Sequence, residues 1–171
     1  MQGLFARNDR VRLVAALVLA ASVSGLAMAF LGEHVFGLEP CILCLYERVP
    51  YGVAAPLALG ALVTAPASRW PAILLGLAAV VFALGAALAF YHVGVEEHWW
   101  GSIAACGGEL PAALDGGDLR DLSAADLKPC DRVDWRLFGL SLAGHNVLFS
   151  LFLAAVSLGG VFAASRKGPT P

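Results

Sequence analysis

The sequence predicts an all-α membrane protein, in which four transmembrane helices form a bundle and two loops lie on the outer side of the membrane. Hydrophobic residues make up 59% of the 171 residues and charged residues only 14%, against about 25% charged residues in ordinary soluble domains. Four stretches, each about 20 residues or longer, contain no Asp, Glu, Lys or Arg. A soluble fold of this size cannot keep so much apolar chain away from water. The composition therefore excludes a soluble enzyme, a disordered protein and a nucleic-acid-binding protein, which would carry a basic surface.

Each uncharged stretch is long enough for one transmembrane helix. A helix rises about 1.5 Å per residue, so about 20 residues cross the roughly 30 Å hydrocarbon layer of a bilayer. The stretches are continuously apolar, which favours helices over the alternating strands of a β-barrel. The predicted single domain, residues 1–171, has helices at about 13–32, 49–67, 71–92 and 137–164 and outer loops at about 33–48 and 93–136.

The first predicted helix follows three arginines, Arg7, Arg10 and Arg12. Together with the small residues Ala27-Met28-Ala29 near its end, this segment also resembles a secretory signal with a cleavage site. The uncharged run of about 20 residues is longer than the usual core of 7–15 residues in a signal. We therefore expect a retained membrane helix, with a cleaved signal as the alternative that N-terminal sequencing would reveal.

Two features inside the other helices give further expectations. The second helix is predicted to begin near Pro50, because proline is tolerated in a first helical turn, and to be weakened or kinked at Pro56. His145 and Asn146 lie within the fourth helix. Polar groups are costly in lipid and usually face inward, so these two predict a hydrogen bond between helices rather than contact with a ligand.

The basic residues in short flanking segments set the orientation. Besides the three N-terminal arginines, Arg69 lies between the second and third helices, and Arg166 and Lys167 follow the fourth. All of these lie on one side of the membrane, whereas all but one of the acidic residues lie on the other. Both termini are therefore expected to be cytoplasmic, with the two longer loops outside.

All four cysteines lie in the outer loops. Cys41-Ile42-Leu43-Cys44 is a C-x-x-C motif, a spacing that favours reversible exchange between dithiol and disulfide. The positive end of the following helix and the charge of Arg48 favour a thiolate there. Cys106 and Cys130 lie in the longer, polar loop. Two pairs in an oxidising exterior indicate disulfides, and pairing within each loop is the simplest arrangement.

Two alternatives explain the same cysteines without redox activity. Structural disulfides could stabilise the loops, but a disulfide within the C-x-x-C motif closes only a very short loop and so adds little to the stability of the fold. A zinc site is less favoured, because structural zinc usually requires two closely spaced pairs and the second pair is far apart in sequence. No metal site is therefore predicted. At the membrane boundary, the C-x-x-C motif is well placed to pass electrons into the lipid.

The longer outer loop contains one further pattern. Leucines alternate with charged residues over 119–127. This arrangement predicts a short amphipathic segment that lies on the membrane surface.

The segment from Pro40 to Arg48 closely resembles the first-loop motif of the DsbB family of disulfide bond formation proteins. The second loop, with its two cysteines followed by Trp135 and Leu137-Phe138-Gly139, is similar to that family too. The resemblance implies a four-helix protein of the bacterial inner membrane with periplasmic cysteine loops. Such a protein reoxidises a soluble thioredoxin-fold oxidase, DsbA, and delivers the electrons to a membrane quinone.

The resemblance also implies roles for individual residues. Cys106 and Cys130 would form the disulfide that is exchanged with the partner, and Cys41 and Cys44 the disulfide that is coupled to the quinone. Arg48 would lie beside the quinone, with His92 near the same ring. The choice between ubiquinone and menaquinone and the sulfur attacked first stay open. The alternative is a non-catalytic membrane protein with structural disulfides or a metal site.

Overall fold

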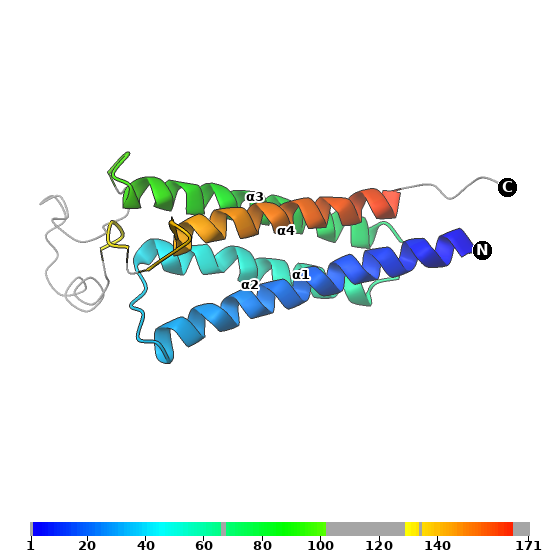
Figure 1. Cartoon of the computed structure of the whole chain (residues 1–171). Coiled ribbons are helices and arrows are strands. Elements are labelled where there is room, and N and C mark those ends of the chain that lie inside the picture. The colour runs from blue at the N-terminus through cyan, green and yellow to red at the C-terminus, as the bar shows by residue number, and fades with distance from the viewer. Residues whose placement is uncertain (1, 66–67, 102–128, 134, 166–171) are drawn as a thin grey trace, which may run out of the picture.

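The computed structural model describes residues 2–65, 68–101, 129–133 and 135–165 and consists mainly of four long helices (Figure 1). The elements in chain order are α1 (Gln2–His34), α2 (Ile42–Val63), α3 (Trp70–Glu96), β1 (Arg136–Leu137), β2 (Leu140–Ser141) and α4 (Leu142–Ser165). Each helix is long and apolar enough to span a membrane, which confirms the predicted fold class. The predicted amphipathic segment at 119–127 and Cys106 lie outside the described residues.

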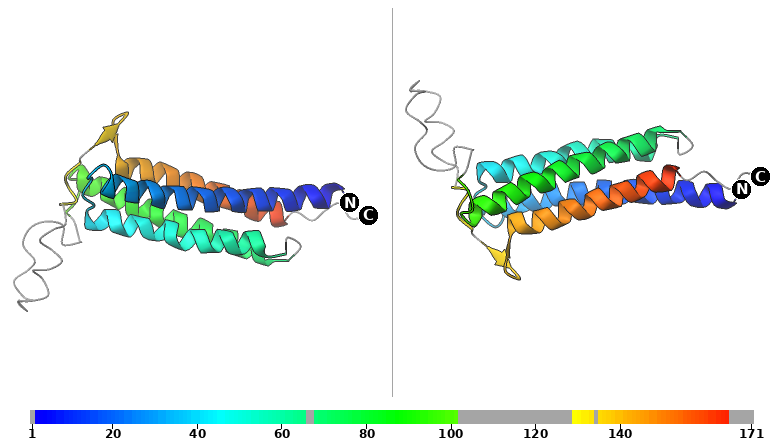
Figure 2. Two further views of the ribbon diagram at one scale, coloured as in Figure 1. Left: turned by 90° about the horizontal axis from the view of Figure 1, so that it is seen from below. Right: turned by 90° about the horizontal axis from the view of Figure 1, so that it is seen from above.

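The four helices run alternately up and down the bundle (Figure 2). α1 contacts α2 and α4, and α3 contacts the same two helices, with the most extensive contact between α3 and α4. The start of α1 and the end of α4 lie at one end of the bundle, whereas the start of α2, the end of α3 and the start of α4 lie together at the other (Figure 1). The first cysteine pair is therefore at the end of the bundle away from the start of α1.

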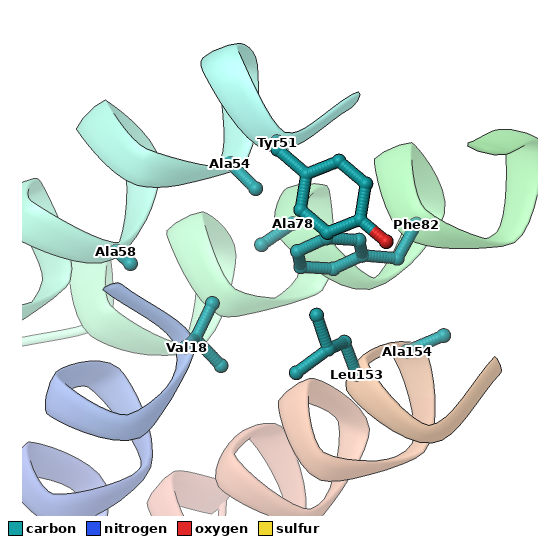
Figure 3. Close-up of a cluster of buried hydrophobic side chains, with 8 residues drawn as sticks. All are labelled: Val18, Tyr51, Ala54, Ala58, Ala78, Phe82, Leu153 and Ala154. Atoms are coloured by element: carbon teal, nitrogen blue, oxygen red, sulfur yellow. The ribbon is translucent and has the colours of Figure 1, made fainter. Parts of the chain in front are cut away.

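Small residues and a pair of aromatic rings form the centre of the bundle (Figure 3). The central cluster consists of Val18, Tyr51, Ala54, Ala58, Ala78, Phe82, Leu153 and Ala154. The ring of Tyr51 packs edge-on against Phe82, with 5.6 Å between the centroids. At Gly85 a Cβ atom would lie 2.9 Å from Pro50, so this close contact between α2 and α3 requires glycine. Small residues allow the close backbone approach by which helices associate in lipid.

The second helix starts earlier than the sequence analysis predicted. α2 begins at Ile42 rather than near residue 49, so the C-x-x-C motif forms its first turn and Pro50 lies in its interior. The prediction was wrong because it used the charges of Glu47 and Arg48 as a boundary, although both side chains find partners inside the protein. Proline is tolerated within a membrane helix because neighbouring groups compensate for the lost hydrogen bond.

The other helices also differ from their predicted bounds. α1 begins at Gln2 instead of residue 13, and α3 continues to Glu96 instead of ending at residue 92. α4 begins at Leu142 instead of residue 137, because a hairpin precedes it. Uncharged stretches mark the part of a helix inside lipid, and a helix continues beyond the hydrocarbon layer wherever its polar residues are satisfied.

The hairpin in front of α4 is held by a tight turn. Phe138 and Gly139 both have positive φ angles, 51° and 83°, as the two central residues of a type I′ turn require. Ser141 follows, and its side-chain oxygen accepts a hydrogen bond from the backbone N–H of Gly144 at 3.1 Å. This N-terminal cap fixes the start of α4 directly after the hairpin.

Candidate functional site

The first turn of α2 brings the sulfur atoms of Cys41 and Cys44 together. Cys41 is the N-cap residue, and its Sγ accepts a hydrogen bond from the backbone N–H of Cys44 at 3.1 Å. The two Sγ atoms lie 2.6 Å apart, and both cysteines are free. Cys41 is only 3% exposed, whereas Cys44 is partly exposed. The pair is therefore one buried and one accessible sulfur at the start of a helix.

The surroundings of Cys41 favour its thiolate. The hydrogen bond with the thiol of Cys44 lowers the pKa of Cys41, and the backbone N–H of Cys44 lowers it further. Burial raises the pKa of Cys41 but does not outweigh these bonds. The direction agrees with the expectation for a cysteine at a helix N-terminus.

His92 and Glu47 extend the site from Cys41 into the bundle. His92 Nε2 lies 3.5 Å from Cys41 Sγ, and His92 Nδ1 lies 2.6 Å from Glu47 Oε1. His92 is 3% exposed and Glu47 is 9% exposed. The Glu47 carboxylate at Nδ1 holds the imidazole so that Nε2 faces the sulfur of Cys41. In this arrangement Cys41 is the nucleophile, His92 the base and Glu47 the group that orients the base. The sequence analysis named His92 but missed Glu47.

Glu47 also connects the site to α4. Its second oxygen, Oε2, accepts a hydrogen bond from Asn146 Nδ2 at 2.6 Å. Asn146 Oδ1 in turn accepts hydrogen bonds from the hydroxyl groups of Tyr51 and Ser150. The predicted hydrogen bond between helices is confirmed for Asn146, whereas the Nδ1 of His145 contacts the backbone oxygen of Ser141 at 2.8 Å. The buried polar groups thus satisfy one another across the bundle, as an apolar environment demands.

Glu96 ties the hairpin to the same site. It lies one turn beyond His92 on α3, and its Oε1 is 3.9 Å from His92 Nε2. Its other oxygen, Oε2, accepts a hydrogen bond from the hydroxyl of Ser141 in β2. The residue that caps α4 therefore also holds a carboxylate beside the imidazole.

Arg48 lies at the contact between α1 and α2. Its Nη1 lies 2.7 Å from Glu33 Oε2, and its guanidinium carbon lies 5.2 Å from the centre of the Phe30 ring. Because Arg48 follows Cys44 by four residues, the two share one face of α2. Within the described part of the chain Glu33 is the one hydrogen-bond acceptor of this guanidinium, so most of its five N–H donors are available.

One cysteine of the second pair lies beside the first pair. Cys130 takes part in a disulfide and is 1% exposed. It belongs to a buried cluster with Cys41, Leu43 and Val95. Its predicted partner, Cys106, lies outside the described residues. The structure therefore brings together Cys41, Cys44, His92 and Cys130 out of the predicted site residues.

An apolar groove of about 400 Å³ lies between α2 and α3. It is lined by Tyr46, Val49, Pro50, Val53, Val81, Leu84, Gly85 and Leu88. None of the predicted site residues lines this groove, but Leu88 of its wall also packs against the buried cluster that contains Cys41, so the groove borders the cysteine site.

Comparison with known proteins gives the family. The model of the family described as disulfide bond formation protein DsbB matches residues 11–159, which is most of the chain. The chain belongs to the DsbB family. The resemblance predicted from the first-loop motif is therefore confirmed.

Relatives in the DsbB family cover nearly the whole chain. Disulfide bond formation protein B of Acinetobacter baumannii is 32% identical over 158 residues, which span 88% of this chain and 91% of the relative. Disulfide bond formation protein B 2 of Pseudomonas entomophila is 31% identical over 153 residues, covering 82% and 84%. Disulfide bond formation protein B of Marinobacter nauticus is 29% identical over 150 residues, which span 86% of this chain and 89% of the relative.

Membership of the DsbB family and the four spanning helices give the general function. The protein is a multi-pass membrane oxidoreductase of disulfide bond formation. The family disfavours the alternative of a non-catalytic membrane protein with structural disulfides. The free C-x-x-C pair, beside a buried histidine and a disulfide-bonded cysteine, is the part of the structure suited to this chemistry.

Proposed function

We propose that this protein reoxidises a periplasmic thioredoxin-fold oxidase of the DsbA type and passes the electrons to a quinone in the bacterial inner membrane. In this proposal both termini are cytoplasmic and the cysteine loops are periplasmic. The observation that carries the proposal is the position of Cys41, which contacts Cys44, His92 and the cluster around Cys130 at one end of the bundle. In this proposal the first pair meets Cys130 of the second pair there, at the boundary between the periplasm and the lipid.

The first step is an exchange between the partner and the second-loop disulfide, which we propose joins Cys106 and Cys130. Cys130 is 1% exposed, so a protein that arrives from solution cannot reach its sulfur. The partner's thiolate therefore attacks Cys106, and the bond to Cys130 breaks. The second thiolate of the partner then displaces Cys106. The partner dithiol becomes a disulfide, and the Cys106–Cys130 disulfide becomes a dithiol.

The second step moves the two electrons to the first pair. Cys130 and Cys41 share one buried cluster, so the released Cys130 thiolate attacks Cys41 when Cys41 and Cys44 are joined. This attack breaks the Cys41–Cys44 bond and leaves the electrons on Cys44. Cys106 then displaces Cys41 from Cys130. The Cys106–Cys130 disulfide forms again, and Cys41 and Cys44 become the dithiol.

The residues around Cys44 fit a quinone as the final acceptor. A quinone supplies a carbonyl-bearing ring that accepts two electrons and two protons. Cys44 is the more accessible sulfur of its pair, and Arg48 on the same helix face has N–H groups available for an oxygen atom. A partly buried positive charge stabilises negative charge that develops on such an oxygen. Arg48 and Cys44 are therefore the residues that we propose to hold the ring.

His92 and Glu47 handle the proton of the buried thiol in this proposal. His92 Nε2, 3.5 Å from Cys41 Sγ, takes the proton, and the Glu47 carboxylate stabilises the resulting imidazolium. The Cys41 thiolate then bonds to Cys44 Sγ, 2.6 Å away, as the Cys44 thiol gives up its proton. The two electrons and two protons released by the dithiol would pass to the quinone. This closes the disulfide and completes the cycle.

Trapping the partner in cells tests the exchange steps. Cys130→Ser leaves Cys106 without its resolving cysteine, so a mixed disulfide with a thioredoxin-fold protein should accumulate and be identifiable by mass spectrometry. Cys106→Ser, which leaves only the buried Cys130, should capture much less. If neither variant captures a thioredoxin-fold protein, or if Cys106→Ser captures more, the proposed order of exchange is wrong.

A further inference from the structure

Cys41, Cys44 and His92 form a compact set of metal-ligating atoms. The two Sγ atoms and an imidazole nitrogen all lie within 4.8 Å of one another. Zinc binds sulfur at about 2.3 Å and imidazole nitrogen at about 2.0–2.1 Å with tetrahedral angles. Those distances place two sulfur ligands roughly 3.8 Å apart, so the present separation of 2.6 Å must grow by about 1 Å. We infer that a rotation of the partly exposed Cys44 side chain supplies this change.

The charge of the set matches a soft divalent cation. Two thiolates and a neutral imidazole carry two negative charges, which a divalent ion neutralises. An uncompensated charge is costly in an apolar environment, and the carboxylates of Glu47 and Glu96 beside His92 further favour a cation there. Thiolate and imidazole ligands favour Zn²⁺ or Cd²⁺, whereas Mg²⁺ and Ca²⁺ require oxygen ligands.

The surroundings of His92 already resemble the outer shell of a zinc site. Histidine ligands of zinc commonly donate their second N–H to a carboxylate, which fixes the ring and makes it a stronger ligand. Glu47 Oε1 lies 2.6 Å from His92 Nδ1, and Asn146 holds the other oxygen of Glu47. Three protein ligands leave the fourth position to water, as in exchangeable rather than closed structural sites.

We propose that the reduced protein binds Zn²⁺ or Cd²⁺ through Cys41, Cys44 and His92, and that the bound ion arrests the protein in its reduced state. Binding converts two thiols to thiolates, releases their protons and transfers no electrons. The Cys41–Cys44 disulfide has no thiolate to offer, so the oxidised protein does not bind the ion. Arrest rests on the proposed function, since it requires that this dithiol be reoxidised in turnover, whereas binding does not.

Metal titration of the full-length chain in detergent tests the binding. In a Cys106→Ser, Cys130→Ser background the first pair supplies all the thiols. The reduced protein should bind one Co²⁺, with the charge-transfer and d–d absorption of a tetrahedral site with thiolate ligands, and Zn²⁺ should displace it. The same protein oxidised at Cys41 and Cys44 should bind none. Absence of a one-to-one complex in the reduced protein would overturn the proposal.

The Zn²⁺ affinities of variants at His92 and Glu47 show whether the ion binds to the proposed three-residue site or to the two cysteines alone. Glu47→Gln should weaken Zn²⁺ binding about 10- to 100-fold, as for outer-shell carboxylates in zinc proteins. His92→Ala should weaken it further, whereas His98→Ala, in an exposed histidine just beyond α3, should leave it unchanged. Circular dichroism melting identifies the folded variants, and Glu47→Gln keeps the test valid if His92→Ala does not fold. Unchanged affinity in folded His92→Ala or Glu47→Gln protein would contradict the assignment.

Arrest is measured on the protein with all four cysteines. Zn²⁺ should slow alkylation of Cys44 and stop oxidation of the dithiol by a quinone, and a chelator should restore both. Metal binding without inhibition would overturn the arrest. Metal binding by a protein that never reduces a quinone would contradict the proposed function alone, so the two failures are distinguishable.

Discussion

Glu47 of α2 and His92 of α3 form a hydrogen bond of 2.6 Å between two almost fully buried side chains. The other oxygen of the same carboxylate accepts a hydrogen bond from Asn146 of α4. One carboxylate therefore links three helices and orients the imidazole toward Cys41. Because burial of an unpaired charge is expensive, the three side chains stabilise one another as a unit.

We expect Glu47→Gln to lower the kcat of quinone reduction about 10- to 100-fold, because the glutamine keeps the size of the side chain but loses the charge that supports an imidazolium. The KM for the reduced partner should change little, since the side chain of Glu47 bonds to His92 and Asn146 and takes no part in the proposed exchange with the partner. Steady-state kinetics with varied partner and quinone concentrations measure both constants. Glu39→Gln, in an exposed acid before α2, is the matched control. A normal kcat in Glu47→Gln would remove the orienting role.

Asn146→Leu should destabilise the protein by about 1–3 kcal/mol, because it leaves one oxygen of Glu47 without its partner and removes the acceptor that the hydroxyls of Tyr51 and Ser150 share. The free energy of unfolding in detergent, from denaturant titration followed by circular dichroism, measures this loss. Leu151→Ala, at a half-exposed position on the same helix, serves as the control for a lipid-facing substitution. Equal stability of Asn146→Leu and the parent would show that the network contributes nothing.

Much of the fold and part of the site could be predicted from the sequence. The uncharged stretches predicted four helices because the cost of charge in lipid is large and local in sequence. Their ends could not be predicted this way, since α2 continues outward through Glu47 and Arg48, whose partners lie on other helices. The hairpin before α4 was missed, although Phe138-Gly139 is a turn sequence that a search for glycine-containing hairpins could have found.

Glu47 was the main omission from the predicted site. It lies 45 positions from His92 in sequence, and only the packing of α2 against α3 joins them. One signal was available, because Glu47 is an acid within what proved to be an apolar helix, three residues after Cys44. An acidic residue inside a membrane helix indicates a functional site by default. The rule could not be applied to Glu47, because the predicted helix began near residue 49 and left Glu47 in the loop. The pairing of Arg48 with Glu33 depends on α1 in the same way.

The Cys41 thiolate should persist to lower pH than an ordinary cysteine thiolate, because hydrogen bonds from Cys44 lower the pKa of Cys41. Replacing the donor thiol in Cys44→Ala should therefore raise the pKa of Cys41 and move its titration to higher pH. Thiolate ultraviolet absorption against pH, in the Cys106→Ser, Cys130→Ser background with a chelator present, measures the shift. A titration of Cys41 that moves to lower pH in Cys44→Ala would contradict the role of this hydrogen bond.

Arg48→Ala should lower kcat/KM for the quinone at least about 10-fold, because it removes the charge proposed to stabilise the acceptor oxygen. Exchange with the partner should stay within about twofold. The ion pair itself is partly exposed and contributes only about 0–1 kcal/mol to stability. Glu33→Gln breaks the same ion pair but keeps the guanidinium, and should retain quinone kinetics. If Glu33→Gln is as impaired as Arg48→Ala, the ion pair rather than the acceptor explains the loss.

The most direct test of the proposed electron path is a count of quinone reduced against partner oxidised. Purified protein in lipid nanodiscs is mixed with a reduced thioredoxin-fold oxidase and a soluble quinone, and both products are measured over several turnovers. We predict one quinol for each partner disulfide, and no quinol from Cys44→Ser protein, in which the disulfide at Cys130 still forms. Partner oxidation without quinone reduction, or full quinone reduction by Cys44→Ser, would contradict this path.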